Sequence, residues 1–93
     1  YIHSKVSIFD GKAAIVSSAN LNGRSLRWDA EAGLLLSDPA DIALLKRRVM
    51  SHWLPDDAGQ SYFDDRTAVT AWAELAAANA CARPDRRRGF LLP

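Results

Sequence analysis

The chain has 93 residues, of which 48% are hydrophobic and 25% are charged, as expected for one small globular domain. A net charge of +1 argues against nucleic acid as the partner, and one cysteine excludes an internal disulfide and a cysteine-based zinc site. With two histidines a metal site would need several carboxylates, so we expect neither metal nor cofactor, and no apolar run is long enough to span a membrane.

Residues 1–20, YIHSKVSIFDGKAAIVSSAN, predict a β-hairpin because two runs of strand-forming residues flank Asp10-Gly11, a strong hairpin turn. Side chains alternate along a strand, so His3 and Lys5 share one face. The return strand brings residues 18–20 opposite His3, with a register left open by one or two residues because the sequence does not fix the turn type. An imidazole, a cation and the polar side chains of Ser18 and Asn20 then converge on one patch, which suits a phosphodiester.

The spacing of these residues resembles the active-site signature of the phospholipase D superfamily. It reads His3-x-Lys5, four residues, Asp10, six residues and then SSAN at 17–20, with Ser17 where the family has glycine. Residues 21–25, LNGRS, and 28–31, WDAE, are similar to the segment that follows the signature in bacterial cardiolipin synthases and phospholipase D-like enzymes. The match runs from Ile2 to Glu31, about a third of the chain.

The expected fold class is α/β: a β-hairpin plus a third strand of a mixed sheet covered by two helices, as part of a phospholipase D-like α/β/α sandwich. Residues 21–28 are expected to form a polar loop, in which Arg27 is solvated charge. Arg24 is either solvated charge or a phosphate ligand, and the sequence leaves both open. Residues 30–37 predict the third strand, buried on both faces after Glu31.

Glu31 is the one acid of that strand. A solvated edge carboxylate is the plain interpretation. The resemblance favours a functional one, in which Glu31 accepts a hydrogen bond from the second ring nitrogen of His3 and stabilises the imidazolium. Asp29 takes this role if the register slips by two residues.

Two helices are expected in the rest of the chain. Asp38 and Pro39 predict the start of a helix over Ala40–Leu54. Its apolar stripe is Ile42, Leu45, Val49 and Trp53. A second helix is expected over Arg66–Ala82, with Val69, Trp72, Leu75, Ala76 and Asn79 on its inner stripe. The Arg-rich tail, 83–93, has a charge of +3, and is either disordered or in contact with an anionic membrane.

The resemblance implies a mechanism. His3 attacks phosphorus and forms a phosphohistidine, while Lys5 and Asn20 hold the non-bridging oxygens. Ser18 supports that phosphate site or the hairpin. Asp10 lies at the turn, remote from His3, and is assigned a structural role there despite its place in the signature. No metal takes part.

In the family, a second copy of the motif supplies the acid for the leaving alcohol, and this chain contains one copy. We therefore expect residues 1–82 to be the C-terminal part of a longer catalytic domain. The copy of the motif in this chain would then be the second of two along the full-length sequence. The other motif would come from the missing upstream half or from a homodimer partner. The expected function is a phosphodiesterase or phosphatidyltransferase acting on phospholipid. Its expected location is the cytoplasm or the periphery of a membrane. The alternatives are a nuclease of the same superfamily and an inactive fragment.

Overall fold

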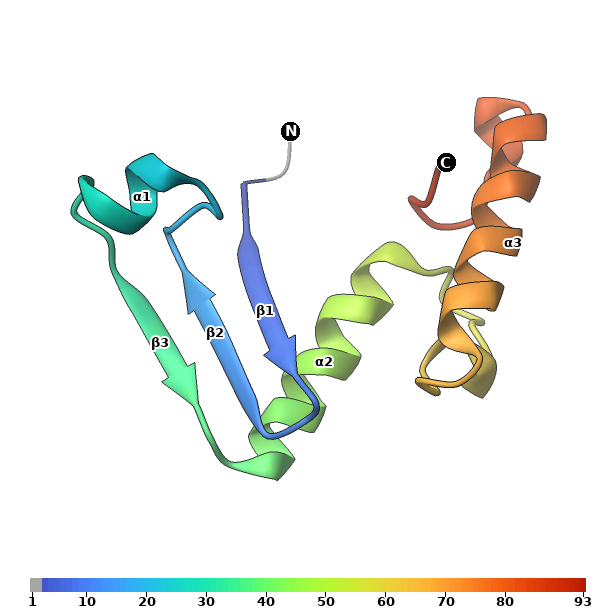
Figure 1. Ribbon diagram of the computed structural model, residues 1–93. Coiled ribbons are helices and arrows are strands. Elements are labelled where there is room, and N and C mark those ends of the chain that lie inside the picture. The colour runs from blue at the N-terminus through green and yellow to red at the C-terminus, as the bar shows by residue number, and fades with distance from the viewer. Residues whose placement is uncertain (1–2) are drawn as a thin grey trace. The chain divides into compact units, whose positions relative to one another are not determined.

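The computed structural model describes residues 3–93 and divides the chain into two compact units, Tyr1–Lys46 and Arg47–Pro93. Tyr1 and Ile2, which begin the expected hairpin, lie outside the described residues. Three strands, β1 (Lys5–Phe9), β2 (Ala13–Ser17) and β3 (Gly33–Leu36), form an antiparallel sheet in the order β1-β2-β3 (Figure 1). With its helices, this sheet confirms the α/β fold class.

The hairpin turn is the one that Asp10-Gly11 predicts. Asp10 and Gly11 both have positive φ, 49° and 65°, and the amide of Lys12 donates to the Phe9 carbonyl at 2.8 Å. Two positive φ angles match the right-handed twist of the paired strands, and Asp-Gly is among the dipeptides that tolerate them. The turn fixes the register, in which Phe9 pairs with Ala13 and Lys5 pairs with Ser17.

β3 is positioned by a close approach at its first residue. Ser17 pairs with Gly33, and a Cβ added to Gly33 would lie 2.8 Å from the Cβ of Ser17 and 3.3 Å from the Val16 carbonyl oxygen. Only glycine lets the two strands meet here without a shift. Since Glu31 precedes Gly33 by two residues, this contact also sets how near Glu31 lies to the end of β2.

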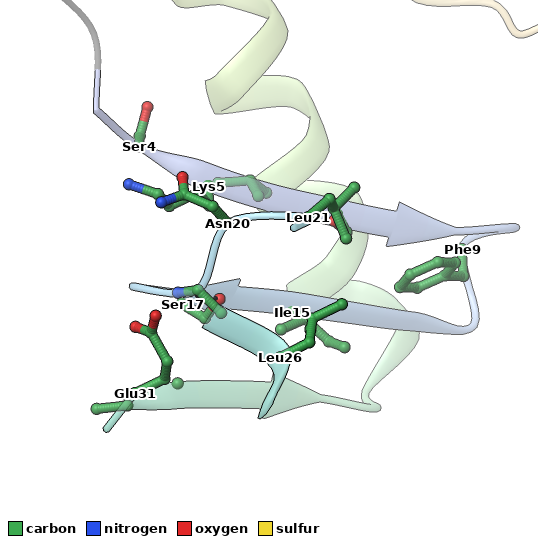
Figure 2. Close-up of a pocket in the computed structure, with 14 residues that line it drawn as sticks. Ser4, Lys5, Phe9, Ile15, Ser17, Asn20, Leu21, Leu26 and Glu31 are labelled. Carbon is green, nitrogen blue, oxygen red and sulfur yellow. Dashed lines mark hydrogen bonds between the residues drawn. The ribbon is translucent and has the colours of Figure 1, made fainter. Parts of the chain in front are cut away.

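The two faces of the sheet differ in character. One face carries Val6, Ile8, Ala14 and Val16, and Ala14 is fully buried. The first turns of α2 (Pro39–Trp53) lie behind this face in Figures 1 and 2, and their Ile42 is fully buried as predicted. The other face carries Lys5, Ser7, Phe9, Ile15 and Ser17, which line a pocket.

α2 begins as predicted. The carboxylate of Asp38 accepts hydrogen bonds from the amides of Ala40 and Asp41, at 2.8 and 3.2 Å, and Pro39 occupies the first helical position. This cap satisfies amides that have no partner within the helix.

Two expectations for residues 21–37 are wrong. Residues 21–28 are not a simple loop, because they contain the short helix α1 (Gly23–Arg27), capped by the side chain of Asn22. The third strand is not buried on both faces, since Leu34 and Leu35 are each 71% exposed. Within the described part of its unit, β3 pairs with β2 alone and forms an edge of the sheet. An apolar run does not tell such an edge strand from a central one.

The second unit is built on α3 (Ala68–Cys81), with 3₁₀ turns η1 (Gln60–Tyr62) and η2 (Pro84–Arg86) beside it in sequence. Leu75 and Asn79 on the predicted stripe are buried, and the indole of Trp72 donates to the Tyr62 carbonyl at 2.9 Å. The inward prediction for Val69 is wrong, as it is 81% exposed. Val69 borders an apolar hollow with Met50, Ala68 and Trp72, which no described side chain fills.

The Arg-rich tail is ordered rather than disordered, because Asn79 holds it against α3. The side-chain amide of Asn79 donates to the carbonyls of Arg88 and Leu91, at 2.8 and 2.9 Å, and accepts from the amide of Arg88 at 2.9 Å. The ring of His52 stacks on Phe90 of the tail at 6.0 Å, which agrees with a packing role for this second histidine. No helix of residues 3–93 has the length and apolar character to cross a membrane.

Candidate functional site

His3 and Lys5 form one hydrogen-bonded pair at the start of β1. The Lys5 ammonium nitrogen lies 2.9 Å from Nε2 of His3 and 2.7 Å from the His3 carbonyl oxygen. An ammonium group has donors and no acceptor, so Nε2 must be the acceptor and the ring proton must lie on Nδ1. In this arrangement Nε2 carries the lone pair that a nucleophile needs.

Asn20 reaches the same end of the sheet from the other strand. The printed pairing of the hairpin ends with Lys5 opposite Ser17, and Asn20 follows three residues after that pair. Lys5 and Asn20 both line the pocket, and Figure 2 shows their polar ends side by side. The structure therefore places Lys5 beside Asn20 at one end of the pocket and pairs His3 with Lys5, while the site formed by all three residues stays a prediction.

Glu31 accepts a hydrogen bond at the end of β2. The hydroxyl of Ser18 donates to Oε2 of Glu31. Hydrogen bonding by Ser18 first, and then the nearby Ser25 hydroxyl, lowers the pKa of Glu31 from its ordinary value of 4.5. Desolvation acts in the opposite direction, and the positive charge of Lys5 lowers the pKa further. Glu31 is thus a carboxylate at neutral pH, and its role toward His3 stays a prediction.

Ser18 connects the end of β2 to the segment that precedes β3. Besides donating to Glu31, its hydroxyl accepts from the Ala32 amide at 3.0 Å, and its own amide donates to the Ala32 carbonyl at 2.9 Å. The hydroxyl proton of Ser18 is therefore already engaged by Glu31. Ser18 organises the carboxylate in this arrangement, and its place among the phosphate ligands stays a prediction.

Two signature-related residues lie away from this cluster. Arg24 pairs with Asp29 at 3.0 Å, and its side chain is 82% exposed. Asp29, the alternative to Glu31, is thereby occupied, and phosphate contact by Arg24 stays a prediction. Asp10 lies in the turn at the far end of β1, about 17 Å along the chain from Lys5 at ~3.3 Å per residue, and its structural role stays a prediction.

The pocket has a polar end and an apolar wall. Its volume is about 610 Å³, and Lys5, Asn20 and Glu31 lie at one end with Phe9 at the other (Figure 2). The apolar wall consists of Phe9, Ile15, Leu21 and Leu26, which are 52%, 40%, 92% and 65% exposed. Among residues 3–93, histidine, cysteine and acidic side chains form no group of three or more that would hold a metal ion.

Sequence reasoning missed the apolar wall and Ser25. The alternation that puts His3 and Lys5 on one face also puts Phe9 there, so part of the wall was open to prediction. Leu21 and Leu26 reach it because α1 folds over the sheet, and a polar run around Gly23 gave little sign of a helix. Ser25 is directed inward by the same helix.

Comparison with known proteins agrees with this geometry. Residues 1–53 match the family described as cardiolipin synthase, PLD-like domain, which is more than half of the chain. Phospholipase D zeta 1 of Arabidopsis thaliana is 50% identical over 76 residues, which are 80% of this chain and 6% of that protein. The chain thus spans a small part of this relative, whose plant origin lends no support to a bacterial source. No solved structure matches.

The hairpin signature, the site at its open end and the family match over residues 1–53 lead to one assignment: the chain belongs to the cardiolipin synthase-like branch of the phospholipase D superfamily.

Proposed function

We propose that this chain is one half of a two-motif active site that cleaves or transfers phosphodiesters of phospholipids through a phosphohistidine. The observation that carries the proposal is the two-part pocket. Lys5 and Asn20 offer donors for an anion at one end, and an exposed apolar wall extends from them toward Phe9. A substrate with a phosphodiester next to a hydrocarbon portion matches both parts.

The charges near the site favour a lipid over a nucleic acid. A strand of nucleic acid needs a groove of cations that follows its phosphates, often with aromatic rings for its bases. Here the ionised Glu31 lines the pocket opposite Lys5, and most of the remaining wall is aliphatic. Burying apolar surface contributes about 25 cal/mol per Å², so an acyl or glycerol portion gains from this wall while a polyanion does not.

The reaction follows from the tautomer of His3. When a phosphodiester enters, its oxygens replace Nε2 as acceptors of the Lys5 ammonium group, and the Nε2 lone pair becomes available. Nε2 attacks phosphorus, and the N–P bond forms as the P–O bond to the leaving alcohol breaks. The proton on Nδ1 stays on the ring, and we assign the stabilisation of the resulting cation to the Glu31 carboxylate.

The second motif completes the cycle. Its histidine protonates the departing alkoxide and then accepts a proton from water or an acceptor alcohol, which attacks phosphorus and releases His3. That motif comes from another part of the full-length protein or from a second copy across a twofold axis. The Arg-rich tail, now seen to be ordered, adds a peripheral contact with an anionic membrane.

The test uses the full-length protein that carries this chain. Thin-layer chromatography would follow products from phosphatidylglycerol, phosphatidylcholine and single-stranded DNA. His3→Ala should abolish both turnover and acid-labile incorporation of phosphate, while the control His52→Ala, a histidine that packs on Phe90, should keep both. Cleavage of DNA alone would point to a nuclease, and wild-type turnover in His3→Ala would refute the nucleophile assignment.

A further inference from the structure

Ser17 occupies the position of the signature at which the family has glycine, and it lines the pocket. It is the last residue of β2 and pairs directly with Lys5 of β1, so the two side chains lie on one face of the sheet. Residues that are directly opposite in an antiparallel pair have Cβ atoms about 4.5–5.5 Å apart. A hydroxyl group therefore lies beside the side chain of Lys5 at the polar end of the pocket.

The strand on the other side of Ser17 leaves its side chain uncovered. There Ser17 pairs with Gly33 of β3, which has no side chain to close the pocket at this point. In Figure 2, Ser17 lies between Lys5 and Glu31 on the pocket side of the sheet. Its side chain is half-buried, so a bound substrate meets this hydroxyl with less competition from water than at an exposed residue.

The hydroxyl of Ser17 accepts one hydrogen bond and keeps its proton. The amide of Ala19 donates to Oγ of Ser17 at 3.2 Å, which uses a lone pair of the oxygen. This bond holds the oxygen toward the segment that leads to Asn20. Within residues 3–93, the proton of this hydroxyl forms no hydrogen bond. Because a hydroxyl proton rotates to suit its partner, Ser17 offers the pocket a donor on a fixed oxygen.

The neighbouring Ser18 differs in this respect. Its proton is engaged by Glu31, and its oxygen accepts from the Ala32 amide at 3.0 Å. Of the two serines, Ser17 is the one with a donor left for a ligand. We propose that Ser17 is a phosphate-binding residue, whose hydroxyl donates to one non-bridging oxygen of the phosphodiester beside Lys5. The inference rests on the proposed function, because it adds a contact between the same pocket and the same class of substrate.

The contact would assist the reaction as well as binding. Hydrogen bonds to an anionic oxygen are shorter and stronger than those between neutral groups. Negative charge on the non-bridging oxygens rises as the N–P bond forms, so a donor held at one of them stabilises the transition state. A single hydroxyl has one proton, and so it serves one of the two non-bridging oxygens. This asymmetry separates a direct contact from a structural role of Ser17.

The experiment uses the full-length protein and phosphatidylglycerol in which sulfur replaces one non-bridging oxygen, as separate Rp and Sp isomers. Sulfur is a weak acceptor, so the hydroxyl assists only the isomer whose oxygen faces Ser17. Formation of the phosphoenzyme is measured in a single turnover. We expect Ser17→Ala to slow that isomer roughly tenfold and to leave the other nearly unchanged. Ser17→Gly, which restores the residue of the family, should change the ratio in the same way, and the exposed control Ser37→Ala should not change it.

Equal slowing of both isomers would overturn the inference, because a hydroxyl that only supports the end of β2 or serves Glu31 acts on both alike. Unchanged rates for both isomers would overturn it too.

If phosphatidylglycerol itself gives no phosphoenzyme, the proposed function fails. In that case, or where neither isomer reacts, calorimetric binding of inorganic phosphate decides the role of Ser17. A dissociation constant that Ser17→Ala raises roughly tenfold and Ser37→Ala leaves unchanged supports the contact. Equal constants in the two variants, or no binding by the wild type, overturn it.

Discussion

Replacing Asn79 by alanine should release the C-terminal tail from α3. Asn79 is 3% exposed and makes three hydrogen bonds to the tail backbone, two to carbonyls of Arg88 and Leu91 and one from the Arg88 amide. Alanine removes all three at once. The helix itself should persist, because alanine is the best helix former.

The cost follows from the three bonds. A net contribution of about 1 kcal/mol for each gives about 3 kcal/mol for the closed tail. The contacts that remain are weak: Arg88 pairs with Asp57 at 2.6 Å, but both side chains are more than half exposed, so this pair contributes at most ~1 kcal/mol. The amide of Phe90 also keeps its bond to the Trp53 carbonyl, at 2.8 Å. The open tail should therefore become about a hundredfold more populated, at ~1.4 kcal/mol per factor of ten.

Trypsin reports this opening directly, because the tail carries Arg86, Arg87 and Arg88 in succession. When opening is fast relative to cleavage, the cleavage rate follows the population of the open form. The tail of Asn79→Ala should then be cut about a hundredfold faster than the wild-type tail. Glu74→Ala, an exposed change in the same helix, serves as the control and should leave the rate unchanged.

Asn79→Leu tests the reasoning, since leucine has a similar volume and no hydrogen-bonding group. Fast cleavage in both variants would agree with a tail held by hydrogen bonds. A wild-type cleavage rate in Asn79→Leu would refute that explanation and show that packing alone holds the tail.

Three further predictions concern the site. Lys5→Met keeps an unbranched side chain but removes the cation, so formation of the phosphoenzyme should slow by ~10²–10³-fold in a single turnover. The control Lys12→Met, in the turn, should have no effect. Equal rates in the two variants would exclude Lys5 from the reaction. Because the folded-state pKa of Glu31 is lowered, its charge stabilises the fold above the unfolded value near 4.5 and ceases to do so as the pH falls through the folded pKa. Urea titrations should thus show Glu31→Gln to be destabilising at neutral pH and to approach the wild type in acid, and a difference independent of pH would count against this account. Gly33→Ala should lower the free energy of unfolding by about 1–3 kcal/mol, because the added Cβ would lie 2.8 Å from the Cβ of Ser17 in β2. Gly23→Ala should be tolerated, because a Cβ added there has no other atom within 4 Å. Equal thermal stability of the two variants would contradict the close approach at Gly33.

The hairpin was accessible from sequence because its determinants are local. Asp10 and Gly11 accept positive φ, and the turn returns the chain so that Ser17 lies opposite Lys5. The start of α2 was predictable for a similar reason, since the cap at Asp38 and the proline that follows it act within one turn.

The parts that sequence did not reveal depend on contacts between distant segments. α1 looks like a loop because its residues are polar, and with five residues it is too short to show a helical apolar pattern. The burial of Asn79 was predicted from its position on the inner stripe of the helix. Its hydrogen-bonding partners were not, because they lie in the tail, nine to twelve residues further along the chain. The exposure of Leu34 depends on which elements cover β3, and an apolar run carries no such information.

In this hairpin, the spacing between the residues of the signature corresponds to the length of the two strands. Four residues between Lys5 and Asp10 are the length of β1 from the site to its tip, and the pairing of Lys5 with Ser17 measures the same length back. One residue added to β1 alone would invert His3 and Lys5 to the opposite face. Two would restore the face but carry both side chains about 7 Å past Asn20. Removing one residue from each strand would shorten the hairpin while leaving its open end paired as before, so lengths in this motif can vary only in step.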